Sequence, residues 1–265
     1  MNLLTRLMLF AAPAVIVAGS AAAAYFLLVD SGGDDVPDLA DIAVPPGRVS
    51  CEVFNVARGY RYHTVVVLNL HDRPEGMEAG GTDQYRPEGF IFTNDITGEV
   101  SGTTAVKAHV VLPEQPQESD YILVDDVLYS KALSTDPWSS KPASESQFSI
   151  PYIPNQACNA LSPDIFLTGL QGTPDVVNGF EATKYHFEDL ETDLPDRHPG
   201  FGPGSDPANF VNNFSGDIWV ADEGGYLIKM DMVGLGAYEN GRPLEVDFFY
   251  EMSDVNAKIT IVAPI

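Results

Sequence analysis

The sequence predicts a mostly β protein: one large, curved antiparallel sheet with a few short helices, behind an N-terminal transmembrane helix. Three observations support this fold class. Residues 7–29 form an uncharged apolar run, apolar and polar residues alternate with a period of two over many later segments, and helical periodicity is scarce. We therefore divide the chain into an anchor (1–30), a linker (31–47) and one folded domain (48–265).

The apolar run at the N-terminus predicts the compartment. At about 1.5 Å per residue, a helix over 7–29 would be roughly 35 Å long, enough to cross a bilayer core of about 30 Å. Arg6 precedes the run and Asp30 follows it, which places the domain outside the cytoplasm, periplasmic or on the cell surface. We favour an uncleaved signal anchor in the cell membrane; the alternative is cleavage after Ala23, which would leave a secreted protein.

The composition limits the partners. The chain has 265 residues, 45% of them hydrophobic, which is enough for one core. Its 38 acidic and 14 basic residues give a formal net charge of −24. Because such a surface repels phosphate groups, we exclude nucleic acid as a partner. The acidity is typical of a protein that stays soluble in a salty or extracellular setting, and a calcium-dependent surface is the alternative.

The linker and the two cysteines are next along the chain. Residues 31–47 combine Gly, Pro and Asp without apolar periodicity, and their aspartates lack the spacing of a calcium loop, so we expect a solvated tether. Cys51 and Cys158 form an even pair in an exported domain, which predicts a disulfide. Two free buried thiols are the alternative. Closing a loop of about 100 residues would stabilise the fold by ~4–5 kcal/mol.

Alternation predicts strands through the rest of the chain, and two segments predict short helices. Asp222 to Gly225 reads as a tight hairpin turn. The first predicted helix begins at the Ser162-Pro163 pair, and the second precedes the predicted strand that starts at Asp217. The strands are expected over 60–70, 106–112, 121–129, 183–187, 217–221, 226–233, 244–252 and 259–262, and the helices over 162–170 and 207–214.

No catalytic, cofactor or metal motif is present. The sequence contains no GxSxG, no HExxH and no phosphate loop, and its five histidines include no pair spaced for one helix face. Neither cysteine lies in a CxxC pair. We therefore expect no enzyme, no cofactor and no metal site.

Alternate residues of a strand share a parity and point to the same face, and one parity of the predicted strands is rich in aromatic residues and methionine. Tyr226, Ile228, Met230 and Met232 share a parity, whereas Lys229 and Asp231 take the other. The segment 244–252 repeats this pattern. A curved, Met-rich face suits a flexible apolar ligand, because methionine repacks around irregular chains. The alternative is that this face is simply the core of the domain, covered by a helix.

Three segments resemble the LolA/LppX-like lipoprotein-carrier superfamily. The first is 121–129 followed by Asp136-Pro137-Trp138. The second is 172–187, where Asn178-Gly179 turns into a strand. The third is 216–230, with a later Asp254-Val255-Asn256 and Pro264. The order of the three segments agrees over roughly residues 50–265.

The resemblance implies a half-barrel of about eleven antiparallel strands, with short helices on its concave side and acyl chains held between them. It implies a domain that binds or transfers lipid or acylated protein, with or without an envelope protein partner. The predicted anchor over 1–30 departs from the pattern of that superfamily and would tether this domain to the membrane. A sensor or interaction module of the same fold, without cargo, is the alternative. From the strand parity and the predicted 162–170 helix, we expect the apolar cavity to be lined by Tyr62, Val66, Leu68, Phe166, Leu170, Tyr185, Phe187, Ile228, Met230, Phe248 and Tyr250.

Overall fold

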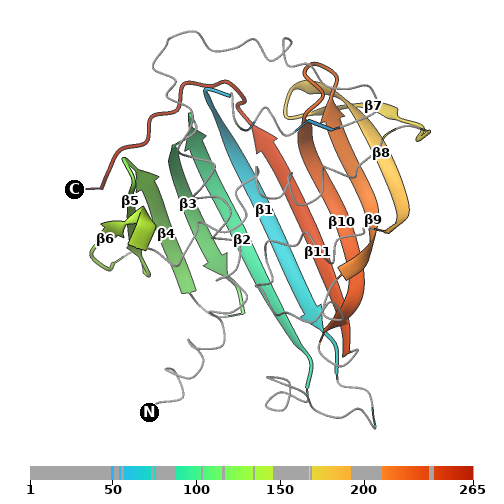
Figure 1. Ribbon diagram of the computed structural model, residues 1–265, viewed down its shortest axis with the longest axis horizontal. Coiled ribbons are helices and arrows are strands. Elements are labelled where there is room, and N and C mark those ends of the chain that lie inside the picture. The colour runs from blue at the N-terminus through green and yellow to red at the C-terminus, as the bar shows by residue number, and fades with distance from the viewer. Residues whose placement is uncertain are drawn as a thin grey trace.

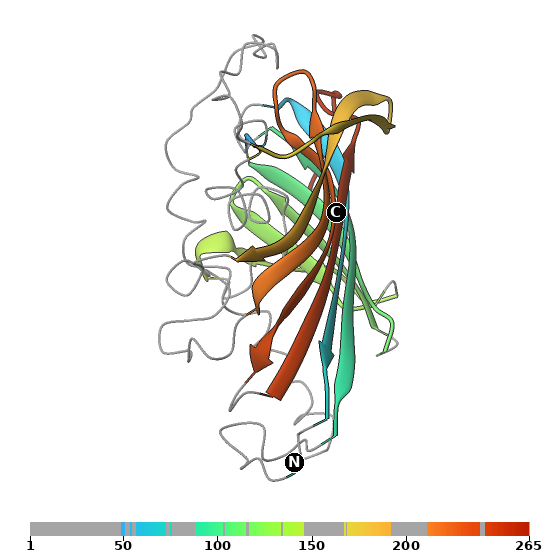
Figure 2. The same ribbon diagram turned by 90° about the vertical axis from the view of Figure 1, so that its right-hand side faces the viewer.

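The computed structural model contains one open, twisted antiparallel sheet of eleven strands (Figure 1). Viewed from the side, the strands twist strongly along the sheet (Figure 2). The residues that the structure describes are 49–50, 54, 57–72, 75, 88–102, 104–114, 117–133, 135–145, 167, 169–191, 211–238 and 242–264.

Each strand pairs with the strands before and after it in the sequence, except that β6 and β7 lie at opposite edges of the sheet. Their order is β6-β5-β4-β3-β2-β1-β11-β10-β9-β8-β7, so the first and last strands pair at the centre. The strands are β1 (Gly59–Leu70), β2 (Phe90–Ser101), β3 (Ala105–Leu112), β4 (Gln117–Val124), β5 (Val127–Lys131), β6 (Ser139–Pro142), β7 (Thr173–Val177), β8 (Phe180–Glu191), β9 (Val211–Ala221), β10 (Leu227–Tyr238) and β11 (Arg242–Ser253).

The predicted fold class is confirmed in its main feature, one large antiparallel sheet, and it needs correction elsewhere. The segment 121–129 is not one strand, because Asp125 and Asp126 both adopt positive φ and turn the chain from β4 into β5. Residues 259–262 form no strand. The sequence pattern also misses β2, since Asn94 and Gly98 interrupt its apolar parity.

The predicted helices are not seen in the described residues. Residues 211–214 form the first part of β9. The prediction of a helix over 207–214 is therefore wrong for the residues that are described. Phe214 packs into the buried face of the sheet instead. Of the segment 162–170, Leu167, Gly169 and Leu170 are described and are not helical, and Leu170 donates a turn hydrogen bond to the carbonyl of Leu167. Among the described residues, helical conformation is limited to the single residue Phe54 and to the 3-10 helix η3 (Ala143–Glu145).

Several predictions fall outside the described residues. They concern the anchor over 1–30, the linker over 31–47 and the disulfide between Cys51 and Cys158. No helix within the described part of the chain has both the length and the apolar character needed to cross a bilayer.

Candidate functional site

The two faces of the sheet differ in chemistry, as the register shows. On one face, which we call the apolar face, Thr64 lies opposite Tyr250, Val66 opposite Phe248 and Leu68 opposite Val246. Met230 lies on the other side of Tyr250 and opposite Ile218 in β9. Paired residues in an antiparallel sheet point to the same side, so a mostly apolar surface extends over β1, β11, β10 and β9.

The structure places most of the predicted cavity residues on this face. Five of them belong to one buried hydrophobic cluster: Tyr62, Phe187, Ile228, Met230 and Tyr250. Three more are partly buried and pack against it: Leu68, Tyr185 and Phe248. Val66 is buried on the same face, opposite Phe248. Leu170 is placed elsewhere: its side chain is 36% exposed, and Leu167 packs against the cluster instead. Phe166 is not among the described residues.

The apolar face is covered by chain that lies outside the strands. Val49, Phe54 and Ala57 are buried in the same cluster, and the ring of Phe54 meets the ring of Tyr60 edge-on with centroids 5.7 Å apart. Ser50 forms a parallel bridge to Tyr226 and donates its amide hydrogen to the carbonyl of Gly225 at 2.9 Å. The segment that precedes β1 therefore closes one end of the face.

Four tyrosines gather near that end. Burial, followed by the interaction with Tyr62, raises the pKa of Tyr60, and burial raises the pKa of Tyr62. Burial raises the pKa of Tyr226 to about 12, with a smaller contribution from Glu223. Burial, followed by the charges of Tyr60 and Tyr226, raises the pKa of Tyr250. The phenols are thus close enough to influence one another and stay neutral at any physiological pH.

Three hydroxyl groups on the apolar face have no hydrogen-bond partner among the described residues: Oη of Tyr62, Oγ1 of Thr64 and Oη of Tyr250. All three residues are buried. Thr64 is absent from the predicted site residues, although its parity between Tyr62 and Val66 places it on this face. A threonine contributes little to an apolar pattern, and strand parity is the signal that could have found it.

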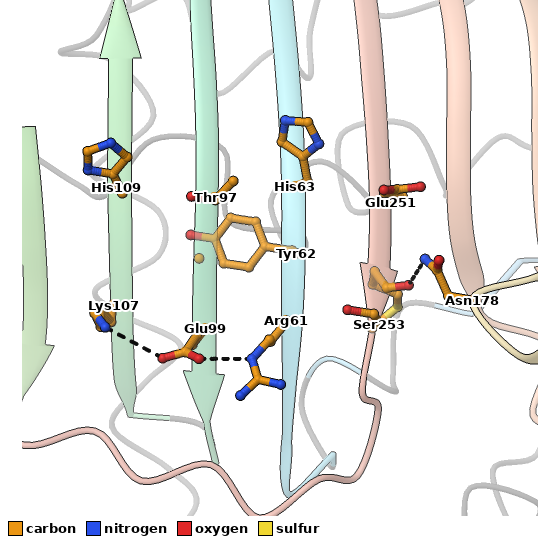
Figure 3. A pocket seen from close by; sticks show the side chains of 12 residues that line it. Arg61, Tyr62, His63, Thr97, Glu99, Lys107, His109, Asn178, Glu251 and Ser253 are labelled. Carbon is orange, nitrogen blue, oxygen red and sulfur yellow. Dashed lines mark hydrogen bonds and ion pairs between the residues drawn. The ribbon is translucent and has the colours of Figure 1, made fainter. Parts of the chain in front are cut away.

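The position of the Tyr62 ring depends on a glycine in the neighbouring strand. The ring extends from β1 across β2, where Gly98 lies opposite Tyr62 (Figure 3). A Cβ atom at residue 98 would lie 2.3 Å from Cζ and 2.5 Å from Oη of Tyr62. Any larger residue at position 98 would displace the phenol.

The opposite face, which we call the charged face, carries cross-strand ion pairs and hydrogen bonds. Arg61 pairs with Glu99 at 2.9 Å and with Asp254, and Lys107 reaches Glu99 at 3.8 Å. Three histidines hydrogen-bond to aspartates of neighbouring strands: His63 to Asp95 at 2.9 Å, His109 to Asp120 at 2.7 Å and His186 to Asp217 at 2.8 Å. Through these contacts, His63, His109 and His186 link neighbouring strands of the sheet.

A hollow of about 430 Å³ lies on the charged face, and Arg61, His63, Lys107 and His109 line it (Figure 3). Each of these four basic side chains already contacts a carboxylate. The basic side chains of the hollow are therefore already paired, which suits a solvated surface better than a site for an anionic ligand. No group of three or more His, Cys, Asp or Glu side chains within the described residues is arranged to hold a metal ion.

The carboxyl groups on the charged face differ in the direction in which their surroundings shift the pKa. Burial opposes the ionisation of Asp120, but hydrogen bonds from Lys131 and His109 outweigh it and lower the pKa. Burial likewise opposes the ionisation of Asp217, but hydrogen bonds from Lys184 and His186 outweigh it and lower the pKa. Asp247 differs from both, because burial, then the charges of Glu245 and Asp231, raise its pKa.

We expect Asp247→Asn to stabilise the domain at neutral pH by up to about 1 kcal/mol. Because the pKa of Asp247 is higher in the folded state than in the unfolded state, ionising this carboxyl above its folded pKa destabilises the fold. The gain should vanish below about pH 4, where the carboxyl is protonated in both states. Urea unfolding across pH measures it. Glu118→Gln removes the same charge from an exposed site, and an equal gain there would attribute the effect to net charge alone.

Comparisons with known proteins find distant similarities among solved structures. No family model matches the sequence, and no curated protein does. A LolA superfamily protein from Nitrosomonas europaea aligns over 84% of this chain and 91% of its own, with 9% identity and a TM-score of 0.24. A domain named for outer membrane lipoprotein sorting, from Vibrio parahaemolyticus, aligns over 77% of this chain and 88% of its own, with 7% identity and a TM-score of 0.26. Similarities at this level support no conclusion about fold or function.

Proposed function

We propose that the protein is a membrane-tethered, extracytoplasmic lipid-binding domain that holds an acyl chain between the apolar face and the chain segments covering it. The observation that carries this proposal is the mostly apolar and largely buried surface over β1, β11, β10 and β9, rich in aromatic residues and methionine. Met230, Met232 and Met252 all lie in it. Thioether side chains repack easily around a flexible ligand.

The energy available to such a site is considerable. Burying an acyl chain contributes about 0.8 kcal/mol per methylene. About ten buried methylenes would contribute ~8 kcal/mol, comparable to micromolar binding before the entropy of association is subtracted. A surface of this kind binds without specific polar contacts and selects poorly among chain types.

The remaining parts of the proposal concern location and partners. The apolar run over 7–29 supports a single-pass anchor, with the domain on the periplasmic or outer side of the cell membrane. A tethered domain cannot diffuse between membranes, so we propose that it extracts or presents lipid or acylated protein locally, with or without a partner in the envelope. We propose no catalytic role, since the sequence contains no catalytic motif.

The second candidate is a sensor or protein-interaction module of the same fold. One observation favours it: Ile228, Met230 and Tyr250 are already fully buried by the chain itself. A face that is sealed in this way would take up no ligand. Uptake of lipid therefore separates the two candidates.

Photo-crosslinking tests the proposal with the full chain in membranes. A diazirine-bearing palmitic acid should label peptides from β1, β10 and β11, and Leu68→Trp should reduce this labelling at least several-fold by filling space on the apolar face. Val67→Trp is the matched control, because Val67 is also partly buried but lies on the charged face opposite Asp247. Equal labelling of both variants, or labelling outside the sheet only, would contradict lipid binding on the apolar face.

A further inference from the structure

The buried hydroxyls of Tyr62, Thr64 and Tyr250 are unusual for a closed core. Each is a hydrogen-bonding group removed from water, and each has no partner within the described part of the chain. Buried polar groups are nearly always satisfied, and an orphaned one destabilises the fold. Three such groups on the adjoining strands β1 and β11 point to a bound molecule as their partner.

The register places the backbone positions of these three residues next to one another on the apolar face. Thr64 and Tyr250 are direct cross-strand partners. Tyr62 lies two residues before Thr64 in β1 and therefore on the same face. Tyr62 leans over Gly98 of β2, where only a glycine leaves room for its ring. The sheet thus positions Tyr62 by a specific feature of the sequence.

The charge of the surroundings defines what the cluster can bind. The phenols of Tyr62 and Tyr250 are held neutral by burial, which raises the pKa of both, and the threonine hydroxyl carries no charge. The buried polar neighbour Asn94, opposite Val66, is neutral as well. The buried cation Arg242 is engaged elsewhere, donating to the carbonyl of His71 at 2.6 Å and to that of Glu88 at 2.7 Å. Among the described residues, an anionic headgroup would find no compensating charge here, whereas an uncharged oxygen would find hydroxyl donors.

We propose that Tyr62, Thr64 and Tyr250 form a polar subsite on the apolar face that binds the ester oxygens of a neutral acyl lipid. The subsite rests on the proposed function and adds to it the class of lipid: an ester-linked, uncharged one rather than a free fatty acid or a phospholipid headgroup. The acyl chain lies on the methionine-rich part of the same face. Hydroxyl donors to the ester carbonyl then select the ligand by its headgroup.

Three diazirine probes with the same chain test the subsite with the full chain in membranes: the methyl ester of palmitic acid, the free acid at pH 8 and the plain alkane. The ester should reach half-maximal labelling of β1 and β11 peptides at roughly a tenfold lower concentration than the alkane. The double variant Thr64→Val with Tyr250→Phe should remove this preference, so that the ester and the alkane reach half-maximal labelling at the same concentration. Tyr129→Phe, on the charged parity of β5, is the control.

The thermal unfolding midpoint of the double variant distinguishes the subsite from a purely structural role. Because the hydroxyls have no partner among the described residues, removing them should leave the midpoint of the ligand-free protein unchanged or raised. Equal labelling by ester and alkane, an undiminished ester preference in the double variant, or preferred labelling by the free acid would overturn the subsite while leaving lipid binding intact. Labelling of the sheet by none of the three probes would overturn the proposed function together with it.

Discussion

Replacing Ile228 with lysine is expected to unfold the domain or to lower its stability by at least about 3–5 kcal/mol. Ile228 is fully buried on the apolar face, and Met230, also fully buried, continues the same row. A lysine there would place an unpaired charge where the described residues offer no carboxylate partner. The expected result is a loss of the cooperative urea transition or a large decrease in its midpoint.

Val233→Lys is the matched control for Ile228→Lys. It lies on the same strand, its side chain is 39% exposed, and it faces Asp247 across the β10–β11 ladder. Lysine at this position meets an excess of carboxylates, so we expect no loss of stability or a small gain. If Val233→Lys were as destabilising as Ile228→Lys, the assignment of the two faces would be wrong.

Gly216→Ala is expected to have the second large effect, about 3 kcal/mol or more. Gly216 adopts φ +146°, and a Cβ atom at this position would lie 2.2 Å from the backbone oxygen of Asp231 in the paired strand β10. The glycine therefore allows β9 to approach β10 closely where β8 and β9 slip in register. Alanine would push β9 away from the centre of the sheet.

Gly102→Ala separates backbone strain from this steric clash. Gly102 also has positive φ, at +58°, but no atom lies within 4 Å of its would-be Cβ. We expect a cost of about 1–2 kcal/mol there, the strain alone. Chemical denaturation of both variants would measure the difference, and equal costs would show that the approach of β9 to β10 is not tight.

The period-two pattern predicts most of the sheet because long strands with one buried face carry a strong signal. In β11, Glu245, Asp247 and Glu251 alternate with apolar residues, so the sequence alone assigns its faces. β1 contains an apolar run over 65–68, and the alternation over 60–63 assigns its faces instead. The pattern fails for β2, whose apolar parity includes Asn94 and Gly98, and Gly98 is needed there to seat Tyr62. It also fails at Asp125 and Asp126, where two aspartates in the left-handed region make the turn that divides the predicted strand.

The helical predictions fail for a different reason. A proline at 207 and the spaced apolar residues after it favour a short helix that ends at Phe214. In the structure the tertiary context is decisive, and Phe214 lies opposite Gly234 of β10 with its ring in the buried face. Propensity is a weak guide where a segment can add a strand to an existing sheet.

The candidate site is predictable from the sequence in its apolar part and not in its polar part. Parity places Ile228, Met230 and Phe248 on one face, as the structure does, because strand geometry dictates which side chains share a face. The orphaned hydroxyls carry no such signal, since whether a buried tyrosine finds a partner depends on the three-dimensional surroundings of its oxygen.

Native mass spectrometry of the full chain, released from a mild detergent, tests the central claim most directly. We expect a species heavier than the chain by the mass of a lipid, an adduct that organic solvent removes and that Leu68→Trp diminishes while Val67→Trp does not. A chain mass without adduct, unchanged after incubation with methyl palmitate, would contradict the binding of lipid on the apolar face.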